Sequence, residues 1–581
     1  MPRAQMRNPE IADAFAELAD LYELDGAIVH RVLAYRNAAK AIRDSGASVA
    51  GLAREGRAEE VAGVGKTIAE KIGALLETGS IPAAEKLKAK FPAGRVEVTR
   101  IPGLGPKRAR LLHDELGIGS LDELRQAAEA GRIREVPGFG AKVEENVLTA
   151  LAAGADGRPE GRTVLSRALA IAEELRDGLR THPAADRVEI AGSARRMTDT
   201  CRDLDLVATA ADARALADAF CALPLIDEVH SSGEAGARAV TNNGLSVDLR
   251  IVAPGNLGNL LQHLTGSKQH NEALRAEAVR RGLHVSEYGI ANDADGRVRE
   301  CVTEAEVYGA LGMSYIEPEL RENRGELRAA REGTLPELVG EEDLRGDLHC
   351  HTVASDGRNT IEEMAEAARD RGHEYLAITD HSATHGFGNH VSPDDLREHM
   401  EAVRRANRRI GGIRLLAGSE VNVMPDGSLD YEDELLSELD WVIASLHSSF
   451  RMDEEEMTER MLRAIEHPSV DAIGHPTGRL LGRREPYALD LERMVDAAAR
   501  TGTFLEINSN PDRRDLSDVH ARLAADAGVK LVIDSDAHGV ERLPNLRWGV
   551  ATARRAWLIA EDVANARPWE DLDALRGRHR R

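Results

Sequence analysis

The stretch GDLHCHTVASDG, residues 346–357, places two histidines on either side of a cysteine and an aspartate shortly after them. Taken alone, it is compatible with a metal site, a redox site at Cys350, or an ordinary strand and turn. If His349 and His351 share a strand, Cys350 points to the opposite face, because successive side chains of a strand alternate. We therefore disfavour the redox interpretation and expect Cys350 to fill a small buried space.

The sequence that follows supplies further residues that bind metals, each close to the end of a short apolar run. From residue 344 onward such runs alternate with helical patterns, which predicts a barrel or another parallel sheet. A single histidine is more often a structural residue than a ligand, but nine imidazoles and carboxylates at successive strand ends favour a metal centre. Mixed nitrogen and oxygen ligands suit zinc, manganese or iron. The candidate ligands are His349, His351, Asp356, His381, Glu420, His447, His475, Asp536 and His538.

The motifs H-x-H, S-D-G, T-D-H, G-x-E, S-x-H, G-H-P and D-A-H resemble those of the polymerase-and-histidinol-phosphatase (PHP) family across residues 344–565. The resemblance implies a distorted (β/α)7 barrel with up to three divalent metals, Mn2+, Zn2+ or Fe2+, and phosphoester hydrolysis. It also implies a division of the ligands among three ions. One ion would bind His349, His351, Glu420 and Asp536, a second Glu420, His447 and His475, and a third Asp356, His381 and His538.

A second candidate site lies in AGSARRMTDTCRDLDLVATA, residues 191–210. Asp203 and Asp205 are two residues apart in a predicted strand, so both side chains point to one face. The predicted strand SVDLRIV, which starts at residue 246, can bring Asp248 to the same face. A lone D-x-D is usually a solvated strand edge. With the preceding G-S turn, its arginines and a third aspartate, the segment resembles a nucleotidyltransferase palm, which implies Mg2+ or Mn2+ at the carboxylates.

Three segments share an apolar-x-G-apolar-G pattern that opens a predicted helix: VAGVGKTIAEKI (61–72), IPGLGPKRARLL (101–112) and VPGFGAKVEENV (136–147). The turn lets the backbone approach a partner, and the helix N-terminus presents free N–H groups to phosphate. One copy would be equally compatible with a simple turn, but three favour contacts to the DNA backbone. The segments resemble helix-hairpin-helix motifs. Their glycines are Gly63, Gly65, Gly103, Gly105, Gly138 and Gly140.

The order of these parts, followed by LTGSKQHNEALR (264–275), resembles family X DNA polymerases over residues 1 to about 323. The resemblance implies roles for particular residues. Asp203, Asp205 and Asp248 would be catalytic, Gly192, Ser193 and Arg196 would bind the triphosphate, and Asn271 would touch the incoming nucleotide. His263 and Leu264 stand where vertebrate members have a Tyr-Phe pair that helps to screen the sugar, so the strength of sugar discrimination is not implied.

The segment GVGKTIAEKI also resembles the part of family X lyases that carries a Schiff-base lysine, and Lys71 matches that lysine. A lysine amine can attack the aldehyde of an abasic sugar. Arg31 stands where the vertebrate lyase has a phosphate-binding lysine. The alternative for Lys71 is an exposed helix lysine without a catalytic role.

The composition limits the remaining possibilities. With 581 residues and 42% hydrophobic content, the chain can form several domains with buried cores. The net charge of −24 argues against general binding of nucleic acid but not against local backbone contacts. No run approaches the ~18 apolar residues of a membrane helix, and the N-terminus has no apolar signal core. We therefore expect a cytoplasmic protein that has no membrane partner and is a monomer.

We predict a multidomain protein of mixed α+β and α/β class. The expected parts are a lyase-like helical domain (1–85), helix-hairpin-helix fingers (86–158), a nucleotidyltransferase palm with a mixed sheet (159–254), a thumb (255–322), a linker (323–343) and the PHP domain (344–575).

The expected function is DNA repair: filling short gaps in primed DNA with deoxynucleoside triphosphates, together with 3′–5′ exonuclease activity of the PHP domain. The same hydrolytic site would suit 3′-phosphate removal or cleavage at abasic sites. Two alternatives stay open, a phosphoesterase targeted to DNA by a palm that does not polymerise, and a non-catalytic scaffold that binds gapped DNA. A small-molecule phosphatase fits residues 344–565 alone and leaves the hairpins without a use.

Overall fold

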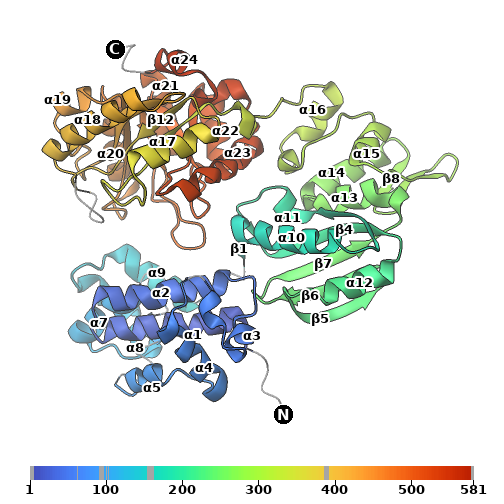
Figure 1. Cartoon of the computed structure of the whole chain (residues 1–581), viewed down its shortest axis with the longest axis horizontal. Coiled ribbons are helices and arrows are strands. Elements are labelled where there is room, and N and C mark those ends of the chain that lie inside the picture. The colour runs from blue at the N-terminus through green and yellow to red at the C-terminus, as the bar shows by residue number, and fades with distance from the viewer. Residues whose placement is uncertain are drawn as a thin grey trace. The chain divides into compact units, whose positions relative to one another are not determined.

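The computed structural model describes residues 6–61, 63–90, 97–99, 101, 104–152, 162–384 and 391–576, which divide into two compact units (Figure 1). The first unit comprises Met1–Thr163, Arg167–Ile190 and Arg202–Pro254. The second comprises Val164–Ser166, Ala191–Cys201 and Gly255–Arg581. Residues 191–201 therefore belong to the C-terminal unit, although the palm strands on both sides of them belong to the first. Among the described residues, no helix is both long enough and apolar enough to cross a membrane.

The first unit begins with helices. Apolar residues at helical spacing, such as Ile11, Phe15 and Leu18, are fully buried where the first helix packs against the second. The helices are α1 (Asn8–Leu24), α2 (Val29–Asp44), α3 (Val49–Arg54), α4 (Lys66–Thr78), α5 (Pro82–Lys88), α7 (Gly105–Leu116), α8 (Leu121–Glu129) and α9 (Ala141–Ala152).

A mixed five-stranded sheet forms the palm, as the sequence predicts. The strand order is β2-β4-β7-β6-β5, and only the pair β4–β7 is parallel. The palm elements are α10 (Leu165–Arg180), β2 (Ala185–Ile190), β4 (Asp203–Ala210), α12 (Ala213–Cys221), β5 (Ile226–Gly233), β6 (Gly236–Thr241) and β7 (Ser246–Ile251). Leu204 and Leu206 of β4 and Val247 of β7 are buried, while the aspartates between them are partly exposed. The alternation gives this sheet one apolar and one polar face.

The second unit contains a small thumb region built around a core that includes Leu274, Tyr308 and Ile316. Its elements are α13 (Leu257–Thr265), α14 (Lys268–Val279), β8 (Leu283–Ser286), β9 (Gly289–Asn292), β10 (Val298–Arg299) and α15 (Glu304–Ala310), followed by α16 (Glu326–Glu332). The short helix α11 (Gly192–Arg195) and the short strand β3 (Thr200–Cys201), which lie between palm strands in the sequence, also belong to this unit.

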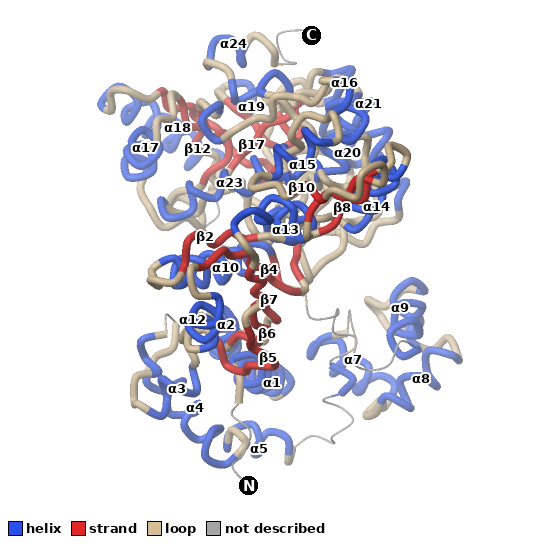
Figure 2. The backbone as a smooth tube through the Cα atoms, turned by 90° about the vertical axis from the view of Figure 1, so that its right-hand side faces the viewer, coloured by secondary structure: helices blue, strands red, loops and turns tan. Residues whose placement is uncertain are grey.

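Seven parallel strands in the order of the chain make up the C-terminal part, and helices surround them (Figures 1 and 2). The strands are β11 (Gly346–Cys350), β12 (Tyr375–Ile378), β13 (Arg414–Asn422), β14 (Trp441–Ser445), β15 (Ala472–Ile473), β16 (Phe504–Asn508) and β17 (Leu531–Asp534). The helices are α17 (Ile361–Asp370), α18 (Pro393–Arg409), α19 (Asp433–Ser437), α20 (Glu454–Glu466), α21 (Leu491–Thr501), α22 (Asp518–Asp526), α23 (Leu546–Arg555) and α24 (Trp569–Asp573).

Side chains close this barrel between its first and last strands. The backbone N–H of Leu348 donates to Asp534 at 2.9 Å, and that of Ser535 donates to Asp347 at 3.1 Å. The amide of Asn565 donates to the carbonyls of Gly346 and Ile533 at 2.9 and 2.7 Å. Because parallel strands all point the same way, the residues that follow them gather at one end of the barrel.

Candidate functional site

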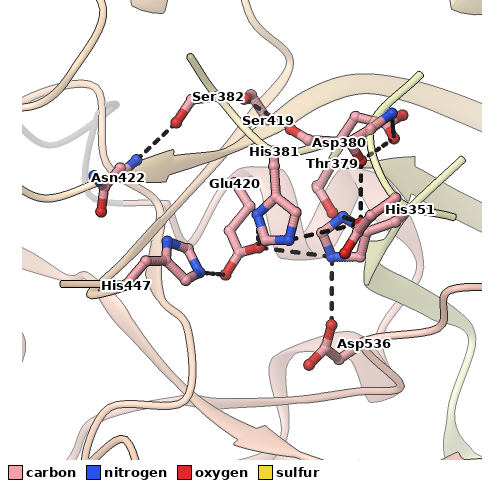
Figure 3. A network of polar contacts seen from close by, with 12 residues as sticks. His351, Thr379, Asp380, His381, Ser382, Ser419, Glu420, Asn422, His447 and Asp536 are labelled. Carbon is pink, nitrogen blue, oxygen red and sulfur yellow. Dashed lines mark hydrogen bonds and ion pairs between the residues drawn. The ribbon is translucent and has the colours of Figure 1, made fainter. Parts of the chain in front are cut away.

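All nine sequence-predicted ligands meet at the carboxyl end of the barrel. His349 lies in β11 and Glu420 in β13, and the other seven follow strand ends or lie in the loops after them. Cys350 is fully buried in the apolar layer that the strands share with the helices, as its alternation with the two histidines predicts. Figure 3 shows His351, His381, His447 and Asp536 arranged around Glu420.

Glu420 is the centre of this cluster. Its Oε2 lies 2.8 Å from Nδ1 of His381 and 3.4 Å from Nε2 of His349. Its Oε1 lies 3.0 Å from Nε2 of His475 and 3.2 Å from Nε2 of His447. One carboxylate thus faces imidazoles from four different strand ends.

Two aspartates complete the cluster. Nε2 of His538 lies 3.2 Å from Asp356, and Nε2 of His351 lies 3.3 Å from Asp536. Among the described residues, the groups that converge closely enough to share an ion are all in the barrel. They are His351–Asp356–His381–His538, His349–His351–Asp536 and His381–Glu420–His447. The division among three ions implied by the resemblance stays a prediction, because His351 and His381 each belong to two of these groups.

The donor atoms fit metal ions. Both ring nitrogens of His351 and Nε2 of His349 are buried, and within the described part of the chain they face carboxylates without forming a well-aligned hydrogen bond. Burial and the nearby His538 and His381 lower the pKa of His351 to about 4, so its imidazole is neutral at neutral pH. Burial raises the pKa of Glu420, but the surrounding histidines lower it well below its usual value. The neutral imidazole of His351 and the ionised carboxylate of Glu420 are forms that bind divalent ions. Burial alone would lower the pKa of His538, but its contacts with Asp356 and Asp536 raise it to about 9, so a metal ion would displace a proton there.

A second layer of polar side chains, which the motif-based reasoning missed, orients these ligands. Nδ1 of His349 lies 2.7 Å from the buried carboxylate of Glu506. Asp380 accepts hydrogen bonds from the backbone N–H of Thr352 at 2.8 Å and the hydroxyl of Ser355 at 2.6 Å. Such partners fix the ring orientation of metal-binding histidines. The sequence feature that could have indicated this layer is Glu506, a charged residue that follows apolar residues in the strand FLEIN.

The three palm aspartates lie on the polar face of their sheet. Asp205 of β4 is the register partner of Asp248 of β7, and Asp203 is opposite Ser246. Asp248 also forms an ion pair with Arg238 of β6 at 2.9 Å. The pairing brings two carboxylates side by side on neighbouring strands, as expected from the sequence. The three are not among the described groups that converge closely enough to share an ion.

The other predicted polymerase residues lie in the second unit. Gly192, with φ +67°, begins α11, and Ser193 follows it. Arg196 donates to the carbonyl of Thr265 at 2.5 Å and pairs with Glu322 at 3.0 Å. Asn271 in α14 donates to the carbonyl of His263 at 2.7 Å. The thumb therefore holds Arg196 from two directions.

The glycine turns present exposed backbone at the start of helices. In the first turn Gly63 has φ +88°, and α4 starts directly after Gly65. In the third, Gly138 has φ +84° and α9 starts after Gly140. Gly105 begins α7 in the second turn, and Gly103 lies outside the described residues. Four of these glycines, Gly63, Gly65, Gly138 and Gly140, are exposed, so they leave the backbone accessible to a phosphate.

Lys71 projects from α4 and is partly buried. Its Nζ lies 5.9 Å from the ring centre of Tyr35, and the guanidinium of Arg31 lies 5.5 Å from the ring centre of Tyr22. The two rings stack on each other with centroids 5.3 Å apart. Lys71, the predicted Schiff-base lysine, and Arg31 therefore lie against a stacked pair of aromatic rings. A lysine on an open helix surface would have no such contact.

Comparison with protein-family models matches separate parts of the chain. Residues 6–81 match a helix-hairpin-helix domain and residues 96–153 a SAM-like helix-hairpin-helix tandem. Residues 260–322 match the DNA polymerase beta thumb, and residues 347–510 match the PHP domain. Together with the palm sheet and the histidine-rich barrel, these matches define the class of protein as a polymerase core joined to a PHP domain.

The chain is 35% identical over 98% of its length to a Bacillus subtilis (strain 168) protein named "DNA polymerase/3'-5' exonuclease PolX", 99% of which is covered. It therefore belongs to the family X DNA polymerases that carry a PHP domain, which confirms the resemblance and the fold class predicted from the motifs.

Part of the chain is also similar to proteins named as phosphatases. A "Probable phosphatase TTE1963" of Caldanaerobacter subterraneus is 34% identical over 33% of this chain and 75% of its own length. A "Probable phosphatase" of Syntrophotalea carbinolica is 30% identical over 39% of this chain and 95% of its own length.

Proposed function

We propose that this protein is a DNA-repair polymerase that fills short gaps and shortens DNA 3′ ends at a separate hydrolytic site. The observation that carries the proposal is the presence of two sites on one chain. One is the pair Asp205–Asp248 on the polar face of the palm, and the other is the cluster around Glu420 at the barrel mouth. A relative named for both activities covers nearly the whole chain.

For the polymerase reaction, Asp203, Asp205 and Asp248 would hold Mg2+ or Mn2+, ions that supply charge neutralisation for the 3′-hydroxyl and the triphosphate. Ser193 in α11 and Arg196, directly after the end of α11, would bind the triphosphate, and Asn271 would contact the incoming nucleotide. The exposed glycine turns would bind the DNA backbone without reading sequence. The substrates are primed or gapped DNA and deoxynucleoside triphosphates.

For hydrolysis, the nine barrel residues would hold up to three divalent ions, Mn2+, Zn2+ or Fe2+, which supply hydroxide near neutral pH and bind the phosphate. Glu420 would bridge two of them, and Glu506 would hold the ring of His349 in the binding orientation. The similarity of part of the chain to proteins named as phosphatases favours a second hydrolytic activity, removal of a 3′-phosphate.

A labelled primer tests the proposal. A 5′-labelled primer in a one-nucleotide-gapped duplex is incubated with manganese, with and without deoxynucleotides. We expect the primer to be extended by one nucleotide when deoxynucleotides are present and to be shortened when they are absent. Shortening in both conditions would support the DNA-targeted phosphoesterase instead, and no change in either would support the non-catalytic scaffold. A primer ending in a 3′-phosphate tests the second activity, because its removal changes mobility without loss of a nucleotide.

A further inference from the structure

The segment 191–201, here called the nucleotide loop, carries Gly192, Ser193 and Arg196. It is part of the same compact unit as the thumb and the PHP barrel, although β2 and β4 of the palm flank it in the sequence. Its conformation includes a non-glycine residue in the left-handed region, Met197 with φ +55°. Such backbone is sparsely populated and persists where surrounding contacts determine it.

Those contacts come from the PHP barrel. Arg514, in the loop after β16, donates to the carbonyl of Met197 at 3.0 Å and lies 3.2 Å from Asp199. Arg479, in the loop after β15, pairs with Asp199 at 2.9 Å. The side chain of Arg514 is only 1% exposed. A buried guanidinium is costly unless it is paired. Asp199 and the loop carbonyl compensate this cost together with the hydroxyl of Thr552, which accepts from Nε of Arg514 at 3.0 Å.

A third barrel arginine reaches Arg196. Arg555, the last residue of α23, donates to the backbone carbonyl of Arg196 at 2.7 Å and to the carboxylate of Glu322 at 3.0 Å. The same oxygen of Glu322 accepts from the guanidinium of Arg196 at 3.0 Å. The barrel therefore fixes both the backbone and, through Glu322, the side chain of Arg196.

We propose that Arg479, Arg514 and Arg555 are positioning residues of the polymerase reaction: they hold the nucleotide loop in the conformation that binds the incoming triphosphate. The inference rests on the proposed function of Ser193 and Arg196. A loop that is ordered before binding does not lose conformational entropy when the nucleotide arrives, so its affinity is higher. The PHP barrel thus serves nucleotide binding through these arginines, independently of its histidine cluster.

Asp199→Asn and Arg479→Gln test this proposal, because both side chains are less deeply buried than Arg514. Single-nucleotide insertion into a gap gives KM and kcat for the deoxynucleotide, and shortening of a single-stranded oligonucleotide with manganese reports on the barrel. Arg500→Gln is the matched control, since this exposed barrel arginine pairs with Glu466 at 3.0 Å, away from the loop.

We expect each variant to raise KM for the deoxynucleotide about tenfold, the size of a typical coupling between sites, with a smaller change in kcat and the shortening rate unchanged. The double variant should be little worse than Asp199→Asn alone, because that substitution already removes the ion pair that Arg479→Gln breaks. An unchanged KM, or an equal loss of insertion, shortening and thermal stability, would overturn the positioning role. Absence of insertion by the wild-type protein would instead contradict the proposed function.

Discussion

Asp205 on β4 lies directly opposite Asp248 on the parallel strand β7. The two residues are far apart in the sequence. The chain forms two further strands, β5 and β6, before it reaches β7. The sheet order therefore creates the carboxylate pair, and the alternation of each strand sets both side chains on the polar face.

Replacing either member of this pair should stop DNA synthesis. Asp205→Asn and Asp248→Asn each remove a negative charge where two ions and a triphosphate would meet, so we expect gap filling to fall about a thousandfold or more. Primer extension on gapped DNA measures the loss. Asp186→Asn is the matched control, because this aspartate lies in β2 of the same sheet, outside the proposed site. Normal extension by Asp248→Asn would remove the aspartate from the catalytic set.

Glu420→Gln should separate metal binding from the fold of the barrel. The substitution keeps the size of the side chain but removes the charge that faces His381, His349, His447 and His475. We expect less bound metal after purification, measured by elemental analysis, and loss of 3′-end shortening with extension retained. Full metal content together with full hydrolysis would contradict a bridging role.

Replacing Glu506, which contacts His349 on the side away from the cluster, should weaken metal binding without abolishing it. Glu506→Gln keeps a group that can contact Nδ1 of His349 but removes the charge at 2.7 Å from it. Outer partners of metal ligands typically contribute 10–100-fold in affinity or activity. We expect the manganese concentration for half-maximal shortening to rise by about that factor, with the maximal rate less affected. An unchanged metal requirement would show that Glu506 has only a structural role.

Lys71 should form a covalent adduct with an abasic sugar if it is a lyase nucleophile. Attack of the amine on the sugar aldehyde gives an imine that borohydride reduces to a stable link. We expect trapping of a labelled abasic DNA by the wild-type protein and none by Lys71→Ala. Lys66→Ala is the matched control at the start of the same helix. Equal trapping by both variants would place the nucleophile elsewhere.

Acid should weaken the support of the nucleotide loop from the thumb. Burial raises the pKa of Glu304, but its bonds to Arg195 at 2.6 Å and to the buried Arg321 lower it below the ordinary value of 4.5. A carboxyl group whose pKa is lower in the folded protein than in the unfolded chain stabilises the fold at any pH above its unfolded-state pKa. This contribution is lost as the pH falls through the folded-state pKa. Denaturant unfolding at pH 6 and pH 4 should show a smaller pH dependence in Glu304→Gln than in the wild type. The same dependence in both proteins would contradict this role.

Short-range sequence patterns were sufficient to predict which residues gather at much of the hydrolytic site. His381, His447 and His475 each follow an apolar run, and parallel strands bring such positions to one end of a barrel. Local sequence does not show which strands pair. The sequence therefore predicted that Asp205 and Asp248 share a face of the sheet, but not that they are register partners. The contacts of Asp199 with Arg479 and Arg514 join positions about 300 residues apart, and no spacing in the sequence indicates them.

A crossed assay tests most directly whether one chain carries two independent sites. Asp205→Ala and His349→Ala are compared with the wild type on the same 5′-labelled, gapped primer with manganese, with and without deoxynucleotides. We predict that Asp205→Ala loses extension and keeps shortening, whereas His349→Ala loses shortening and keeps extension. A variant that loses both activities, or a variant that loses neither, would contradict two separate sites with these roles.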